Sequence, residues 1–104
     1  MQDLTVTLIQ TELFWEDIPA NLAKFEEKIE AISEKTNIIV LTEMFTTRFT
    51  MNVEKQAESM IGTAVSWLVG KARTKNVNIL GSVIIDEDKK YFNRLVWAKP
   101  DGKI

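Results

Sequence analysis

One segment constrains the fold more than any other: a short apolar run that is followed by a single carboxylate. Residues 37–41 read Asn-Ile-Ile-Val-Leu, and Glu43 comes two positions later. A continuous run of large aliphatic residues is typical of a parallel strand that is covered on both faces of its sheet. Because open α/β sheets bind ligands at the carboxyl ends of their strands, Glu43 is the first candidate functional residue.

Strand and helix patterns alternate along the rest of the chain. Alternating polarity predicts a first strand over Leu4–Gln10, and Pro19 favours the first turn of a helix. The apolar stripe of that helix comprises Leu22, Phe25, Ile29 and Ile32. A second helix is predicted to begin at Thr63, and strands are predicted over residues 77–85 and 91–98. The order β-α-β-α-β-β predicts an α/β fold with mainly parallel strand pairing.

The loops and strands of this predicted fold contain further features. Residues 42–60 have no clear period, and long irregular stretches in compact domains are often functional. Phe14 and Trp15 follow the first strand, where they either line a pocket or cap the core, and the core is favoured. Gly81 lies inside a predicted strand, which indicates a close approach of the backbone or a β-bulge.

The balance of charges excludes several classes of partner. The chain has 13 basic and 15 acidic residues and a net charge of −2, so it offers no basic field to a nucleic acid. Its longest apolar runs are about five residues, far short of the roughly 20 that span a bilayer. No secretory signal is visible at the N-terminus. A cytoplasmic protein that binds neither nucleic acid nor membrane is therefore expected.

The absence of cysteine and histidine excludes further classes of site. Without cysteine there is no disulfide and no thiolate metal site, and without histidine the commonest zinc ligand is missing. A Ser-His-Asp triad is likewise excluded within these residues. The acidic cluster at residues 86–88 lacks the ligand spacing and the glycine of a calcium loop, so a polar hairpin turn is favoured over a cation site.

Two polar residues have both a functional and a structural interpretation. A carboxylate that is partly buried at the end of a strand can serve as a general base near neutral pH. Glu43 fits that role, but it could equally cap a loop or pair with Arg48. Asn93 lies inside an otherwise apolar strand, where it either orients active-site loops or satisfies a backbone group, and the structural role is favoured.

Four segments, in this order and spacing, resemble the N-terminal portion of a known family. They are Leu-Thr-Glu-Met-Phe-Thr-Thr at 41–47, Gly-Ser-Val-Ile at 81–84, Tyr-Phe-Asn-Arg-Leu-Val at 91–96 and Pro-Asp-Gly-Lys-Ile at 100–104. Together they are similar to the nitrilase (carbon–nitrogen hydrolase) superfamily, and most similar to its omega-amidase-like branch. The resemblance covers essentially the whole chain, so residues 1–104 are expected to form a single, incomplete carbon–nitrogen hydrolase domain.

The resemblance implies a fold and an activity. The family's fold is a four-layer α-β-β-α sandwich, of which this chain would form the N-terminal part. Its members commonly form homodimers, need no cofactor, and use a glutamate, a lysine and a cysteine. Glu43 matches the glutamate, which acts as the general base. The expected reaction is hydrolysis of the non-peptide C–N bond of a small linear amide.

The chain also departs from the family's pattern. Thr42 stands where the family usually has proline, and Arg48 stands where it often has a small residue. Lys103 does not match the family's lysine, which is expected a few residues beyond Ile104, and the cysteine is missing. The isolated chain is therefore expected to be inactive, and the turn at residues 100–102 is expected to introduce a strand outside it.

A second class of function remains open at this point. The chain could be a self-contained, non-catalytic α/β module that binds a small ligand near Glu43, Phe14 and Trp15. The two hypotheses differ in whether a lysine and a cysteine follow Ile104.

Overall fold

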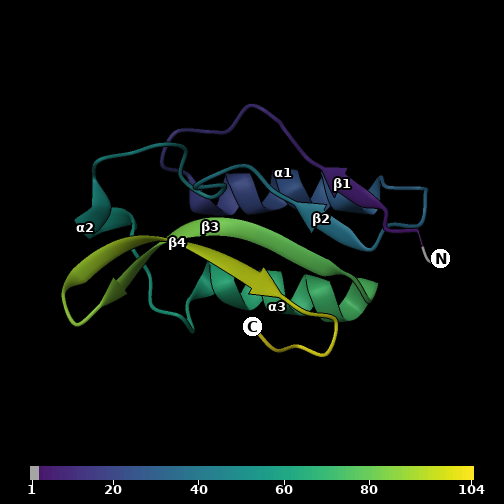
Figure 1. Ribbon diagram of the computed structural model, residues 1–104. Coiled ribbons are helices and arrows are strands. Elements are labelled where there is room, and N and C mark those ends of the chain that lie inside the picture. The colour runs from purple at the N-terminus through teal and green to yellow at the C-terminus, as the bar shows by residue number, and fades with distance from the viewer. Residues whose placement is uncertain (1–2) are drawn as a thin grey trace.

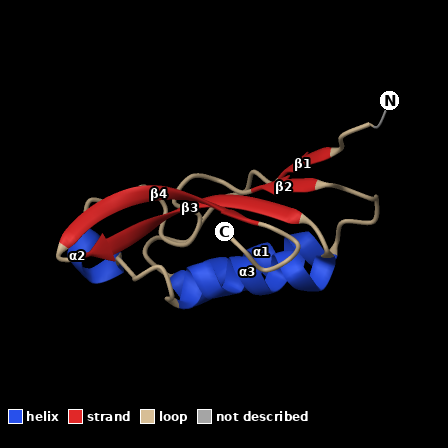
Figure 2. Cartoon of the chain, turned by 60° about the horizontal axis from the view of Figure 1, so that its bottom comes forward, coloured by secondary structure: helices blue, strands red, loops and turns tan. Residues whose placement is uncertain are grey.

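A four-stranded sheet with helices on one face forms the framework of the protein (Figure 1, Figure 2). The computed structural model describes residues 3–104. The strands are β1 (Val6–Leu8), β2 (Ile38–Val40), β3 (Asn78–Glu87) and β4 (Lys90–Ala98). The helices are α1 (Ile18–Glu30), α2 (Val53–Gln56) and α3 (Thr63–Lys75).

The topology confirms the predicted α/β fold. The strands lie in the order β1-β2-β3-β4, with parallel pairing from β1 to β3 and an antiparallel β3–β4 pair. The strand predicted over Leu4–Gln10 is shorter than expected, although Ile9 N still donates to Val40 O at 2.9 Å. The short helix α2 was not predicted, because four residues are too few to show an apolar period.

Side chains cap the beginnings of both long helices. Asp17 precedes α1, and its Oδ1 accepts a hydrogen bond from Ala20 N at 3.1 Å. At α3 the cap comes from outside the helix, since the Glu58 carboxylate accepts hydrogen bonds from Ala64 N and Val65 N, both at 3.0 Å. Glu58 lies at the end of the irregular segment, so this cap ties that segment to α3.

The core lies between the sheet and the helices, and Phe45 is one of its central residues. Phe45 comes from the segment after β2 and is fully buried. Its ring centroid is 5.5 Å from that of Phe25 in an edge-on contact and 5.9 Å from that of Trp67. The predicted stripe of α1 is confirmed for Leu22, Phe25 and Ile29, which are all buried in the same core. Its fourth residue, Ile32, lies beyond the end of α1 and is only partly buried.

Strand β3 passes Phe45 at a glycine. A Cβ atom on Gly81 would lie 2.8 Å from Cδ1 of the Phe45 ring, closer than packed atoms allow. The β3–β4 register continues through Gly81, which pairs with Val96, so no bulge is present there. The predicted close approach is confirmed, and its partner is an aromatic ring.

No long helix covers the second face of the sheet within residues 3–104 (Figure 2), and of the β3 residues on this face Ser82 and Ile84 are nevertheless buried. Its exposed apolar side chains are Val6, Leu8, Leu95 and Trp97. In β2 only Ile39, which belongs to the core, is fully buried. The prediction that residues 37–41 are covered on both faces is therefore wrong for the described part of the chain, because α1 and α3 pack on the same side.

A two-residue turn joins β3 to β4. Asp88 and Lys89 both have positive φ angles, 53° and 64°, as a type I′ hairpin turn requires. Oδ1 of Asp86 accepts a hydrogen bond from Lys89 N at 3.0 Å. Asp86 and Glu87 of the acidic cluster end β3 and Asp88 begins the turn, so the cluster belongs to the hairpin.

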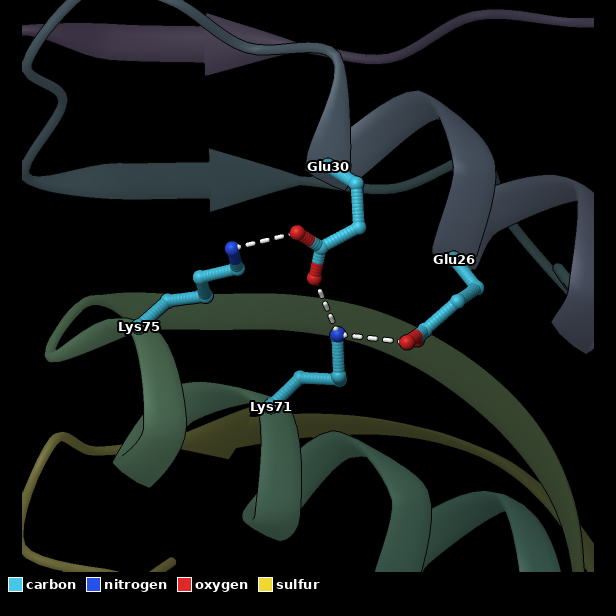
Figure 3. A network of polar contacts seen from close by, with 4 residues as sticks. All are labelled: Glu26, Glu30, Lys71 and Lys75. Carbon is cyan, nitrogen blue, oxygen red and sulfur yellow. Dashed lines mark hydrogen bonds and ion pairs between the residues drawn. The ribbon is translucent and has the colours of Figure 1, made fainter.

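Four charged residues join α1 to α3 (Figure 3). Nζ of Lys71 lies 2.7 Å from Glu26 and 2.8 Å from Glu30, and Nζ of Lys75 lies 2.6 Å from Glu30. Burial alone would lower the pKa of Lys71, but hydrogen bonds to Glu26 and Glu30 outweigh it and raise that pKa. Hydrogen bonds from Lys71 and Lys75 lower the pKa of Glu30 from 4.5 to about 2.

Candidate active site

Glu43 stands where the chain leaves β2. Leu41 N donates to Leu80 O at 2.8 Å, which continues the strand pairing one residue beyond β2. The hydroxyl of Thr42 donates to Ile9 O at 3.2 Å, so Thr42 ties the end of β2 to the segment after β1. Glu43 then begins a turn, which places its side chain at the carboxyl end of β2.

The turn after Glu43 is held by β3 in a conformation that non-glycine residues rarely adopt. Met44 has a φ angle of 49°, in the left-handed region. Its N–H donates to Oγ of the buried Ser82 at 2.7 Å, and Phe45 N donates to Ser82 O at 3.3 Å. Because Phe45 is also anchored in the core, the backbone at Glu43 is fixed from its C-terminal side.

The Glu43 carboxylate borders a cleft on the open face of the sheet. Its Oε1 accepts a hydrogen bond from Nδ2 of Asn93, on β4, at 2.9 Å. The cleft has a volume of about 320 Å³, and its lining residues are Leu41, Glu43, Ser82, Asn93 and Leu95. Glu43 is exposed, so the partial burial that would tune its carboxylate is not present within residues 3–104. No element within residues 3–104 covers the carboxylate, although Ser82 and Ile84 on the same face of the sheet are buried.

Two polar neighbours of Glu43 differ from their sequence-based interpretations. Asn93 is exposed, and its amide donates to the Glu43 carboxylate rather than to a backbone group. Arg48 was a candidate partner for Glu43, but its guanidinium lies over the Trp15 ring, 5.8 Å from the centroid. Within the described residues, the ion pairs do not include Arg48. Glu43 is therefore held by an uncharged donor.

The aromatic pair of the first loop neither lines the cleft nor caps the core. Phe14 is 51% exposed and Trp15 is 56% exposed. Lys24 lies over the Phe14 ring, as Arg48 does over the Trp15 ring. The buried residue of this loop is Leu13. The favoured interpretation, that the pair caps the core, is therefore wrong, and a cation lies over each of the exposed rings instead.

Sequence reasoning missed Asn21, which is fully buried on α1. Its Nδ2 donates to Phe14 O at 2.8 Å and to Thr46 O at 2.7 Å, and its Oδ1 accepts from Phe14 N at 2.8 Å. The amide thus joins the first loop to the turn that contains Thr46. Its spacing in the sequence could have indicated its burial, since Asn21 precedes Phe25 and Ile29 at intervals of four and so lies on the apolar stripe of the helix. A polar group on that stripe requires partners.

Other kinds of site are not found in the part of the chain that the structure describes. Within residues 3–104, no three acidic side chains lie close enough to hold a metal ion. No helix in that range has the length and apolar content needed to cross a bilayer. Beside the cleft, burial and the carboxylates of Asp86 and Glu54 raise the pKa of Tyr91, so its phenol stays protonated at neutral pH. Glu43 alone among the cleft-lining residues is ionisable.

Comparison with known proteins connects this geometry to one family. The family model for carbon-nitrogen hydrolase matches residues 5–104. The omega-amidase YafV of Escherichia coli (strain K12) is 38% identical over 105 residues, which cover 100% of this chain and 40% of that protein. The 2-oxoglutaramate amidase of Bacillus subtilis (strain 168) is 28% identical over 102 residues, which cover 96% of this chain and 39% of that protein.

A solved structure shares the same fold. The structure of a CN-hydrolase superfamily protein from Xanthomonas campestris matches with a TM-score of 0.93 and 33% sequence identity. The match covers 99% of this chain and 39% of that protein. The chain therefore spans about 40% of the length of these three relatives.

Proposed function

Because this chain belongs to the carbon–nitrogen hydrolase family, as its four motif segments predicted, we propose that it supplies the general base of an omega-amidase. Glu43 is that base. The observation that supports the proposal is the position of its carboxylate, which borders a cleft at the end of β2 with Oε1 bound to Asn93. Within residues 3–104, Oε2 accepts no hydrogen bond and is available to a proton.

The first half of the proposed reaction needs a thiol and a cation. The chain has no cysteine, so in the complete enzyme a cysteine and a lysine outside these residues join Glu43. Glu43 takes the thiol proton, the thiolate attacks the amide carbon, and the lysine stabilises the oxyanion. The C–N bond then breaks, and the leaving ammonia takes the proton from Glu43. By itself, the 104-residue chain is expected to release no ammonia.

Water completes the cycle. Glu43 takes a proton from a water molecule, which attacks the thioester carbon. The C–S bond breaks, the carboxylic acid leaves, and the thiolate regains its proton from Glu43. The proposed substrate is a small linear amide with a terminal carboxamide, such as the 2-oxoglutaramate named for the relative from Bacillus subtilis. The complete enzyme is expected to act in the cytoplasm as a homodimer.

Replacement of the proposed base tests this function. In the complete enzyme, Glu43→Gln keeps the shape of the side chain and an acceptor for Asn93, but the amide cannot take a proton. We expect kcat for ammonia release from 2-oxoglutaramate to fall by a factor of about 10²–10⁴ with little change in Tm. The control is Glu34→Gln, at an exposed carboxylate that does not line the cleft, and it should keep full activity. Near-normal turnover by Glu43→Gln would contradict the proposal.

A further inference from the structure

We propose that Asn93 is a positioning residue for Glu43, which selects one orientation of the carboxylate and leaves its second oxygen to the reaction. This inference rests on the proposed function of Glu43 as the general base. Asn93 acts through Glu43 and does not itself take or give a proton. Three features of the structure give Asn93 this role: the register of the β3–β4 hairpin, the exposure of Glu43, and the neutrality of the amide donor.

The hairpin register brings two polar side chains to the same cleft. Asn93 pairs with Ile84, and two residues further along β4, Leu95 pairs with Ser82. Opposed residues of an antiparallel pair share a face of the sheet, so Asn93 and Ser82 both face the open side, where they line the cleft. Ser82 holds the backbone after Glu43, and Asn93 holds its carboxylate. The β3–β4 hairpin therefore holds both the backbone next to Glu43 and the carboxylate of Glu43.

The exposure of Glu43 makes this side-chain contact necessary. A glutamate side chain has several rotatable bonds, and no core packing selects its rotamer at this exposed position. Nδ2 of Asn93, 2.9 Å from Oε1, is the hydrogen-bond donor that Glu43 has among residues 3–104. A displacement of about 1 Å at a reacting group can cost roughly 10²-fold in rate. The orientation set by Asn93 should therefore appear in kcat.

An amide suits this task because it carries no charge. A lysine or arginine in the same place would strongly favour the ionised carboxylate and so weaken it as a base. Arg48 is close in sequence and could have taken that place, but its guanidinium lies over Trp15. The carboxylate is thus oriented without a neighbouring cation.

Three substitutions of Asn93 in the complete enzyme separate positioning from packing. Asn93→Leu removes the donor and keeps the number and branching of the side-chain heavy atoms. Asn93→Gln keeps an amide donor on a longer side chain, and Asn93→Asp replaces the donor with a second carboxylate. The matched control is Arg94→Gln, because Arg94 lies on the same strand, faces the opposite side of the sheet, and pairs with Glu87 at 2.8 Å.

The expected results differ between the three variants. Asn93→Leu should lower kcat roughly 10- to 100-fold, while KM changes less than about threefold, and Asn93→Gln should recover part of the loss. In Asn93→Asp, the acid limb of the pH–rate profile should move upward by about one pH unit or more, because each of two adjacent carboxylates disfavours ionisation of the other. Arg94→Gln should leave kcat and the pH profile unchanged.

Each contrary outcome has a distinct meaning. If Asn93→Leu has normal kcat, or if the acid limb does not move in Asn93→Asp, the positioning role is overturned, while an inactive Glu43→Gln variant still supports Glu43 as the base. An active Glu43→Gln variant overturns both proposals. Should Asn93→Leu fail to fold, the carboxyl carbon-13 resonance of Glu43 in the complete enzyme decides the matter. Its titration should move to higher pH in Asn93→Asp, and an identical titration would overturn the inference.

Discussion

Glu43 depends on three neighbours, each of which acts on a different part of the residue. The Thr42 hydroxyl ties down the strand end before it, Ser82 accepts the Met44 N–H after it, and Asn93 binds its carboxylate. These contacts come from the loop after β1, from β3 and from β4. The backbone that carries the carboxylate is therefore held in place, even though nothing within residues 3–104 covers the carboxylate itself.

The contact between Ser82 and Met44 makes a prediction at the scale of single residues. Ser82→Ala leaves the buried Met44 N–H without its acceptor, which should lower the free energy of unfolding by about 1–3 kcal/mol. Thermal unfolding monitored by circular dichroism measures this loss. Ser66→Ala removes an exposed hydroxyl from α3 and should have little effect. Equal melting temperatures for the two variants would show that the Ser82 contact does not stabilise the turn.

Some of these residues could be recognised from the sequence and others could not. Glu43 stands out because it follows an uninterrupted apolar run. Ser82 gives no such signal, since a serine in a strand looks the same whether it faces solvent or a buried N–H. Asn21 did give a signal, through its helical spacing to Phe25, but its partners come from loops whose conformation has no period. Contacts between irregular segments therefore could not be predicted from the sequence and are seen only in the structure.

At the scale of elements, the ion pairs between α1 and α3 set a pH dependence of stability (Figure 3). The pKa of Glu30 falls from 4.5 to about 2 in the folded protein, chiefly through its hydrogen bond with Lys71. A lowered carboxyl pKa adds stability that is fully present above the unfolded value, and it is lost as pH falls from about 4.5 towards 2. We expect Tm to fall over this range, and to fall less in Glu30→Gln. Equal decreases of Tm in the parent protein and in Glu30→Gln would show that Glu30 does not cause this pH dependence.

The helices and strands with a strong apolar period were predictable, and their ends were not. In α1 and β2, several residues along the element pack against the core, and this produces a recurring apolar pattern in the sequence. The ends depend instead on particular partners, such as the Glu58 carboxylate that caps α3. The predicted double-sided burial of β2 failed for a related reason, because an apolar pattern does not tell which layer supplies its cover.

At the scale of the whole molecule, one helical layer covers one face of the sheet, and the other face is open and apolar (Figure 2). Contiguous exposed apolar surface of this kind attracts apolar ligands and other chains. We expect the 104-residue chain to bind a hydrophobic fluorescent dye. The double variant Val6→Lys and Leu8→Lys should bind much less, whereas Ile61→Lys, which alters an exposed residue outside the sheet, should bind normally. Equal fluorescence from all three proteins would place the apolar surface elsewhere.

The central claim is that Glu43 takes the proton that starts the cleavage of the amide. The most direct measurement is the rate of the first ammonia release in a single turnover of the complete enzyme, which isolates this step from the later hydrolysis. We expect this rate to fall by a factor of about 10² or more in Glu43→Gln. A first release at the normal rate in that variant would contradict the role of Glu43 as the base.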